Sequence, residues 1–350
     1  MDFKVSGINI PNDGQQVVDF WASNFPEWHQ EKYHWFYQDN PAGEASCWKV
    51  NLDGDNKMFG TVALFPRVIQ TAKGKLSAGV VGDFALAEKK RTFWPAFMLQ
   101  KKVLSSAKEK QVDFIYGLPN EYADQLMIRA GYISVGLCGR YAKKIRSNSY
   151  FRERVKSGFF ARILSLVADT VLFLISSETY MSVFTRNGDC KIETEIDSRF
   201  DQLWEKASAK YALIGERNSR FLNWRFGQCP YIEYKIYSLT DPKTGDLRGY
   251  VVYHINDGEL CISDIFMLDV DKYFDHLMTR FLKHARKLKI NTVVFCFFGN
   301  RKLLGKFRKF NFIERKEKRH FLIHADKNTI EKYNLSDPDN WYFMECDNDT

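Results

Sequence analysis

The sequence predicts a mixed α/β fold built from two tandem copies of one domain, joined by an apolar helical linker. Three observations lead to this prediction: landmark residues occur twice in the same order, runs of Val, Phe and Leu have the length and alternation of strands, and helical segments separate these runs. A chain of 350 residues that is 45% hydrophobic can form two domains that each bury a core. We place the first domain at residues 1–146, the linker at 147–190 and the second domain at 191–350.

The repeated landmarks keep a nearly constant spacing. The Trp, Pro and Gly that open each copy lie 189 positions apart, and a deletion of eight residues followed by a single-residue slip accounts for the later offsets. A repeat of this length is a whole domain rather than one unit of a solenoid. The landmarks are Trp35, Pro41, Gly60, Asp83, Asn120 and Gly131-Tyr132 in the first copy, and Trp224, Pro230, Gly249, Asp264, Asn300 and Asn311-Phe312 in the second.

The first copy is expected to alternate strands with helices. Thr92 is placed to cap the long helix, and Pro95 is tolerated in its first turn. Gly131 is expected to end the short helix. The expected strands are residues 3–10, 46–50, 60–65, 76–87, 113–118 and 132–142, and the expected helices are residues 15–24, 31–37, 93–110 and 122–130.

The second copy repeats this order. Its expected strands are residues 191–196, 232–239, 249–255, 259–268, 292–298 and 312–323. Its expected helices are residues 199–206, 218–226, 272–289 and 303–310.

Composition and motifs exclude several classes of protein. The amino terminus lacks a basic start followed by an apolar stretch, and no Cys-x-x-Cys pair occurs among the seven cysteines, so we expect a cytoplasmic protein with reduced thiols. The seven histidines show no metal-ligand spacing, so no metal is expected. A Gly-x-Ser-x-Gly elbow is absent, which gives a serine hydrolase no support.

Positive charge gathers in two segments of a chain whose formal charge is +8. Such runs are either solvated faces or surfaces that attract phosphate, on a cofactor, RNA or an anionic membrane. The second segment extends from Arg301 to Arg319. The first contains Arg140, Lys143, Lys144, Arg146, Arg152, Arg154 and Lys156.

The linker contains an unusual apolar segment at residues 157–175. Arg162 and Asp169 divide it, so it lacks the roughly 18 uncharged residues of a membrane span. It is expected to be a helix that packs between the domains, or one that lies on a bilayer surface at the inner face of the membrane. Interdomain packing is the preferred interpretation.

The element order resembles the GNAT superfamily of acyl-CoA-dependent acyltransferases in both halves. The more specific part is residues 82–100, GDFALAEKKRTFWPAFMLQ, followed by residues 116–132, YGLPNEYADQLMIRAGY. These resemble the fourth strand, cofactor helix, fifth strand and following helix of such enzymes. The chain is also similar to tandem GNAT proteins encoded with envelope-polysaccharide genes.

The resemblance implies a cofactor site for acetyl-CoA or another acyl-CoA in the first copy. In the family, pantetheine lies between the splayed fourth and fifth strands, and a loop at the helix start holds the pyrophosphate through free N–H groups and the helix dipole. This loop falls on residues 91–96, where Trp94 replaces a family glycine and Pro95 has no N–H. The implied cofactor contacts are Asp83, Phe84, Ala85, Leu86, Ala87, Arg91, Thr92 and Asn120.

The second copy departs further from the family pattern. Its matching stretch begins with Asp269 and Asp271, whose charges repel a pyrophosphate, so no acyl-CoA is expected there. The family's general-acid tyrosine corresponds to Met127 in the first copy and Phe307 in the second. Neither side chain can donate a proton.

Other side chains are candidates for the general base and the general acid. Asp83 and its counterpart Asp264 could accept a proton from an attacking amine or hydroxyl, and Tyr116 could replace the general acid. Because the acid is kept in a copy that is not expected to bind a cofactor, a structural hydrogen bond is the favoured role of the repeated aspartate. Tyr37 and Asp264 are the candidate substrate contacts. The aromatic residues around Tyr37 are also typical of a helix that packs into a core.

The sequence therefore predicts an acyltransferase that moves an acyl group from acyl-CoA to an amine or hydroxyl, such as an amino sugar or a lipid-linked envelope precursor. One alternative is a Fem-type transferase, which pairs two such domains and takes its aminoacyl group from tRNA. Another is a non-catalytic protein that binds a ligand or partner in the same fold.

Overall fold

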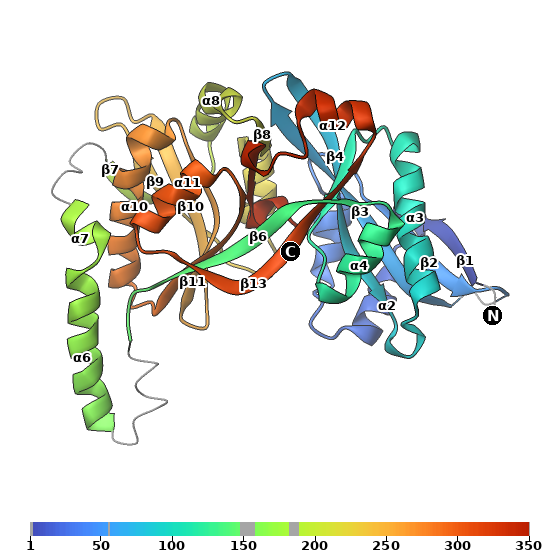
Figure 1. Cartoon of the computed structure of the whole chain (residues 1–350), viewed down its shortest axis with the longest axis horizontal. Coiled ribbons are helices and arrows are strands. Elements are labelled where there is room, and N and C mark those ends of the chain that lie inside the picture. The colour runs from blue at the N-terminus through green and yellow to red at the C-terminus, as the bar shows by residue number, and fades with distance from the viewer. Residues whose placement is uncertain (1–2, 55–56, 148–157, 182–188, 350) are drawn as a thin grey trace. The chain divides into compact units, whose positions relative to one another are not determined.

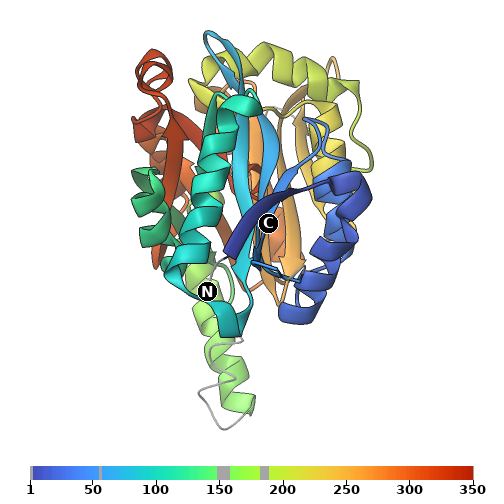
Figure 2. The same cartoon turned by 90° about the vertical axis from the view of Figure 1, so that its right-hand side faces the viewer.

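The computed structural model describes residues 3–54, 57–147, 158–181 and 189–349 (Figures 1 and 2). The chain forms two compact units, each assembled from separate segments. The first unit contains Met1–Cys138, Ala209–Ile232 and Arg319–Thr350, and the second contains Gly139–Ser208 and Glu233–Lys318. These units differ from the contiguous segments 1–146 and 191–350 that we expected.

The first unit holds the whole first series of predicted elements and several later ones. Its strands are β1 (Phe3–Ile8), β2 (Ser46–Leu52), β3 (Met58–Thr71), β4 (Gly74–Leu86), β5 (Phe114–Gly117), β8 (Leu213–Gly215), β14 (Trp341–Met344) and parts of β6 (Ile133–Lys144) and β13 (Ile313–Ala325). Its helices are α1 (Ile10–Asp13), α2 (Gln15–Asn24), α3 (Phe93–Glu109), α4 (Glu121–Ala130), α9 (Ser219–Leu222) and α12 (Lys327–Tyr333). Its π-helical turns are η1 (Tyr33–Gln38) and η4 (Asn223–Gly227), and its 3-10 turns are η2 (Glu88–Lys90), η5 (Pro338–Asn340) and η6 (Glu345–Asp347).

The second unit has a similar series of elements but fewer helices and strands outside that series. The short 3-10 turn η3 (Ser208–Lys210) lies at its boundary. Its strands are β7 (Asp189–Glu193), β9 (Lys235–Thr240), β10 (Leu247–Asn256), β11 (Glu259–Met267), β12 (Thr292–Gly299) and the remaining parts of β6 and β13. Its helices are α6 (Gly158–Leu174), α7 (Ser177–Met181), α8 (Ser198–Ala207), α10 (Val270–Lys287) and α11 (Arg301–Lys309).

In both units a series of antiparallel strands is followed by a parallel pair. In the first, β1, β2, β3 and β4 pair antiparallel in that order and β4 pairs parallel with β5. In the second, β7, β9, β10 and β11 pair antiparallel and β11 pairs parallel with β12. The mixed α/β fold predicted from the apolar patterns is confirmed, whereas the duplication of the sequence stays a prediction.

The last strand of each series explains why the units are not contiguous in sequence. The end of β13 pairs antiparallel with β5, from Leu322 with Gly117 to Ala325 with Phe114. The end of β6 pairs antiparallel with β12, from Thr292 with Lys144 to Phe297 with Gly139. Each parallel pair is therefore completed by a strand from the other half of the sequence.

The core of the first unit lies between its strands and α3 with α4. Val62 and Leu64 of β3 face this core, where they join Leu99 and Val103 of α3. Because neighbouring strand residues point to opposite faces, Phe65 lies on the other face of β3. There it packs against Phe36 and Tyr37 of η1, with ring centroids 5.1 and 5.0 Å apart. The residues predicted as a helix at 31–37 thus form a π-helical turn that is buried.

The two landmark tryptophans at the predicted repeat spacing meet in the first unit. The Trp35 indole donates to the Trp224 carbonyl at 2.7 Å, and the Trp224 indole donates to the Trp35 carbonyl at 2.8 Å. Their ring centroids are 5.6 Å apart. This reciprocal pair joins η1 to η4, which are distant in sequence.

A buried ion triad fixes the C-terminal segment in the first unit. The Asp347 carboxylate accepts from Arg67 at 2.8 Å and from Arg217 at 2.6 Å, and all three side chains are buried. Burial acts to raise the pKa of Asp347, but the two guanidinium groups outweigh it and the pKa is lowered. The triad is typical of a buried charge that two opposite charges and hydrogen bonds satisfy.

The first basic segment is not a continuous cationic surface. Lys143 is buried and pairs with Glu178 at 3.1 Å. Arg140 pairs with Glu259, and Arg146 pairs with Asp169. Lys144 is exposed, and Arg152, Arg154 and Lys156 lie outside the described residues.

The apolar segment that was expected to be a helix forms α6 over residues 158–174, within the second unit. Its apolar side chains are largely exposed. Packing between the domains and placement on a bilayer surface both stay predictions. No helix of the described residues is long and apolar enough to cross a bilayer.

Replacing Asp347 with Asn should destabilise the protein by about 3–5 kcal/mol, because Arg67 and Arg217 would remain buried without an anion. The free energy of unfolding in urea measures this loss. The carboxylate stabilises the fold above its ordinary pKa of about 3.9, and this stabilisation is lost as pH falls through its lowered folded value. The wild-type advantage over D347N should therefore shrink in acid.

Glu216→Gln is the matched control. Glu216 pairs with Lys75, whose side chain is exposed, so its loss should cost less than about 1 kcal/mol. If D347N and E216Q lowered the free energy of unfolding equally, the buried triad would stabilise the fold no more than an ion pair at the surface.

Candidate functional site

The parallel pair of the first unit separates where the candidate site begins. β4 pairs with β5 at Ala78 with Phe114, Gly79 with Ile115 and Val80 with Tyr116. β4 continues to Leu86 against β3, while the chain after Gly117 turns into α4. Beyond Val80, therefore, β4 is no longer paired with β5.

A β-bulge lies on β4 at this point. Gly82 pairs with Ala63 and Ala85 pairs with Thr61, so Asp83 and Phe84 together oppose Val62. Asp83 has a φ of 42°, which is unusual for a residue other than glycine. Bulges bend a strand and redirect its side chains, and they are common next to functional sites.

A cavity of about 800 Å³ lies beside the separated strands. Its walls come from the end of β4, the start of α3 and the first two turns of α4. The lining residues from these elements are Phe84, Ala85 and Leu86 of β4, Arg91, Thr92, Phe93 and Ala96 at the start of α3, and Asn120, Tyr122, Ala123, Gln125, Leu126 and Arg129 around α4. Phe25 completes the lining.

The N-terminus of α3 opens onto this cavity. Thr92 occupies the N-cap position that we predicted, but its side chain makes no capping hydrogen bond. The first N–H groups of a helix have no partner within the helix and attract anions. Trp94 is 62% exposed and does not line the cavity, so the indole leaves the cleft open.

Two guanidinium groups add positive charge at the same place. Arg91 lies beside the Leu86 carbonyl at 3.3 Å and over the Phe25 ring. Arg129 of α4 lies over the Phe93 ring, with 5.8 Å between the guanidinium carbon and the ring centroid. The helix dipole and both cations favour an anionic group such as a pyrophosphate.

Asp83 is the centre of a buried hydrogen-bonded cluster. Its carboxylate accepts from Lys32 at 2.7 Å, from Tyr37 at 2.7 Å and from Trp28 at 3.4 Å. Burial, followed by the Asp83 charge, raises the pKa of Tyr37 well above its usual value. Both oxygens of the carboxylate are occupied by these donors, so this geometry favours the structural role of Asp83.

Asp349 supplies a second carboxylate near the bulge. Its Oδ2 atom accepts from the Asp83 amide at 3.2 Å. Desolvation raises the pKa of Asp349 above its ordinary value, and the Asp83 carboxylate adds to the increase while Lys32 opposes it. A raised pKa makes a carboxylate a stronger proton acceptor than an ordinary aspartate.

The C-terminal segment carries Asp349 across the place where β4 and β5 separate. The Tyr116 hydroxyl of β5 donates to the Asp347 carbonyl at 2.7 Å, and the Asp83 amide of β4 donates to Asp349. Gly82 makes this approach possible, because a Cβ atom there would lie 2.0 Å from Asp349 Oδ2.

The predicted site residues are only partly brought together. Phe84, Ala85, Leu86, Arg91, Thr92 and Asn120 line the cavity. Ala87 does not line it, and its amide donates to Phe59 instead. Asn120 also caps α4, since its side chain accepts from the Ala123 amide at 3.0 Å.

The predicted catalytic and substrate side chains lie away from the cavity. Tyr116 is fully buried, its hydroxyl is used by the Asp347 carbonyl, and burial raises its pKa. Tyr37 is fully buried against Asp83. Asp264 is buried in the second unit, where it accepts from Tyr250 at 3.1 Å.

The second unit has the same parallel pair but a different helix start. β11 and β12 pair as far as Ile262 with Phe295. At the start of α10 the Asp269 side chain caps the helix by accepting from the Lys272 amide at 3.0 Å. Asp271 pairs with Lys302 and Lys306. Carboxylates therefore occupy the place where an anion would bind.

Arg129 and Asp349 were not singled out in the sequence. Arg129 lies in the segment that carries the family resemblance, so its place on a predicted helix was the signal that could have identified it. Asp349 had no such signal, because its position depends on contacts with residues distant in the chain. In the part of the chain that the structure describes, no group of three or more acidic, His or Cys side chains could hold a metal ion.

Comparison with solved structures identifies the fold. A conserved protein of unknown function from Enterococcus faecalis, described as a probable N-acyltransferase, covers 93% of this chain over 72% of its own length, at 14% identity and a TM-score of 0.64. A GCN5-related N-acetyltransferase from Anabaena variabilis covers 92% over 72% of its length, at 12% identity and a TM-score of 0.63. N-myristoyltransferase from Saccharomyces cerevisiae, with bound myristoyl-CoA, covers 93% over 79% of its length, at 10% identity and a TM-score of 0.57.

This chain has the fold of the GCN5-related N-acetyltransferases. No family model matches the sequence, and no curated protein matches it. At such low identity the likeness establishes the fold, and the reaction must be argued from the site.

Gly82→Ala tests the position of Asp349. The added methyl group would displace the Asp349 carboxylate and leave the Asp83 amide without its acceptor, so we expect a loss of about 1–3 kcal/mol in the free energy of unfolding. Gly305→Ala is the control, since it has no neighbour within 4 Å and Ala is favoured in a helix by up to about 1 kcal/mol. A G82A protein as stable as wild type would contradict the contact.

Proposed function

We propose that this chain is an acyl-CoA-dependent acyltransferase that holds its cofactor in the cavity of the first unit. The observation that carries the proposal is the cavity beside the separated strands β4 and β5, which has a helix N-terminus and two arginines at one end. The GCN5-related fold supports the proposal, because the comparison structures include N-acetyltransferases and a myristoyl-CoA complex.

The lining residues fit the two parts of such a cofactor. Arg91, Arg129 and the first amides of α3 would hold the pyrophosphate. Phe84, Ala85 and Leu86 present backbone along the separated edge of β4, where they would hold the pantetheine arm. Bound acyl-CoA would supply an activated thioester.

Asp349 is our candidate general base. The acceptor nitrogen or oxygen forms a bond to the acyl carbon, the carbon–sulfur bond breaks, and the acceptor proton passes to the Asp349 carboxylate, which can return it to the sulfur. Lys32 and Tyr37 keep Asp83 in place, and the Asp83 amide orients Asp349. Asp83 thereby acts as a positioning residue.

The acceptor that we propose is an amine or hydroxyl of an amino sugar or a lipid-linked envelope precursor. This choice depends on the sequence resemblance alone. The depth of the cavity limits the length of the acyl group that it can hold. Near β4 the cavity is lined by the apolar residues Phe84, Ala85 and Leu86.

Calorimetry tests the cofactor site. Acetyl-CoA or a longer acyl-CoA should bind, and Arg91→Gln and Arg129→Gln should each weaken binding roughly tenfold through loss of one charge-assisted contact to phosphate. Lys89→Gln is the matched control, since Lys89 is exposed and does not line the cavity. Absence of heat at millimolar concentrations of several acyl-CoAs would refute the proposal.

The same preparation distinguishes the Fem-type alternative. Co-purified tRNA would raise the absorbance at 260 nm, and its binding should fall steeply with salt. A protein that binds tRNA and no acyl-CoA would support the alternative.

Asp349→Asn tests the general base. We expect the turnover of an accepted amine to fall by about a hundredfold to ten-thousandfold while acyl-CoA affinity stays unchanged. In the wild type, activity should rise with pH through the raised pKa of Asp349, because only the carboxylate accepts a proton. This rise of activity with pH should be absent in D349N. If D349N keeps both the activity and the rise with pH, another group is the base.

A further inference from the structure

α6 presents most of its apolar residues to solvent, whereas Ser165 and Asp169 face the protein. Every Phe, Ile, Leu and Val of α6 except Leu172 is exposed, and the exposed fraction reaches 70% at Phe159 and 71% at Leu166. Ser165 is buried and Asp169 is largely covered. This is the reverse of an ordinary surface helix, whose apolar stripe faces the core.

Polar contacts hold α6 in this orientation. Ser147 donates through its amide to Asp169 at 2.6 Å and through its hydroxyl to the same carboxylate at 2.8 Å. The Ser147 hydroxyl is also 3.2 Å from the Ser165 carbonyl, and Arg146 pairs with Asp169 at 3.7 Å. Turning the apolar face inward would break these contacts.

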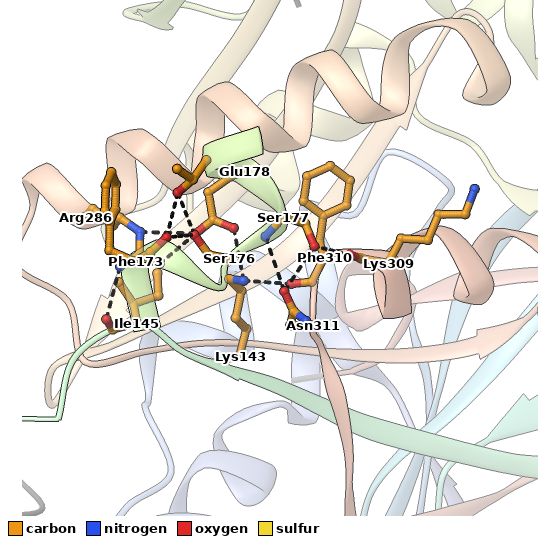
Figure 3. Close-up of polar contacts among 11 residues, drawn as sticks. Lys143, Ile145, Phe173, Ser176, Ser177, Glu178, Arg286, Lys309, Phe310 and Asn311 are labelled. Atoms are coloured by element: carbon orange, nitrogen blue, oxygen red, sulfur yellow. Dashed lines mark hydrogen bonds and ion pairs between the residues drawn. The ribbon is translucent and has the colours of Figure 1, made fainter. Parts of the chain in front are cut away.

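A buried ion cluster anchors the C-terminal end of α6 through α7 (Figure 3). Glu178 accepts from Arg286 at 2.7 Å and pairs with Lys143 at 3.1 Å. Lys143 donates to the Phe310 carbonyl, and Arg286 donates to the Ile145 carbonyl. The helix is therefore attached to a rigid part of the second unit.

We propose that the outer face of α6 docks onto the surface of a lipid bilayer. With 3.6 residues per turn, the exposed Phe, Ile, Leu and Val positions span an arc of roughly 200°. A second copy of the chain or a groove in a partner would cover a narrower stripe, whereas acyl chains can surround a broad face. This inference does not depend on the proposed acyl transfer.

Charge supports an anionic bilayer. The chain has a formal charge of +8. Arg162 is exposed near the start of α6, and exposed Lys309 lies at its other end, where Ser177 donates to the Lys309 carbonyl (Figure 3). Cations beside an inserted apolar face strengthen binding to anionic headgroups. At 17 residues, α6 is too short to span, so it would lie in the plane of the surface.

Vesicle sedimentation of the full chain tests the proposal. The wild-type protein should pellet with phosphatidylcholine vesicles that contain about a quarter phosphatidylglycerol, and more weakly with phosphatidylcholine alone. Leu166→Glu should lower the partition coefficient at least tenfold, because it places a charge at the centre of the apolar face. The double variant Phe159→Ser, Phe160→Ser adds no charge, and it should also lower the partition coefficient.

Ile313→Glu is the matched control. Ile313 belongs to the second unit, is 64% exposed and lies outside α6, so its substitution should leave vesicle binding unchanged. Failure of the wild type to pellet with either vesicle, or equal losses in L166E and I313E, would overturn the proposal. So would sedimentation equilibrium that shows a wild-type dimer and an L166E monomer, because a second copy would then cover the face.

Discussion

The separation of β4 from β5 beyond Val80 is the constraint on which the candidate site depends. A parallel pair that stayed in register would satisfy the edge of β4 and leave no room for a ligand. The bulge at Asp83 and Phe84 bends β4 away, and α3 starts just beyond the end of the strand. As a result, an apolar strand edge, unsatisfied helix amides and two guanidinium groups border one cavity. A long ligand with an apolar arm and an anionic end would place the arm along the apolar strand edge and the anion beside the helix amides and guanidinium groups.

The contacts around the bulge offset the cost of its strained backbone. Asp83 adopts a left-handed conformation, which costs free energy for a residue with a side chain. Lys32, Tyr37 and Trp28 bind its carboxylate, and Asp349 binds its amide. The aspartate therefore maintains the shape of the strand, while the neighbouring Asp349, whose pKa is raised, is the carboxyl group that we propose as the general base.

The first unit is completed by segments far from it in sequence. Trp224 forms a reciprocal hydrogen-bonded pair with Trp35, and Arg217 and Asp347 form a buried ion triad with Arg67. These contacts fix the C-terminal segment, which in turn positions Asp349. α6 shows the opposite arrangement, since its anchoring contacts are polar and its exposed face is apolar. An exposed apolar face of this kind is the surface that we propose docks onto a bilayer.

The sequence by itself determined the mixed α/β fold, the order of the elements and part of the cavity lining. Strand alternation, helix caps and the GNAT resemblance are local signals, and among the residues they singled out Phe84, Arg91, Thr92 and Asn120 line the cavity. Only the tertiary structure decided the rest. The partners of Asp83, the approach of Asp349 and the exposure of α6 arise from contacts between residues that are distant in the chain, and no local pattern encodes such contacts. For the same reason Tyr116 and Tyr37 looked available in the sequence, although packing buries both hydroxyls against fixed hydrogen-bond partners.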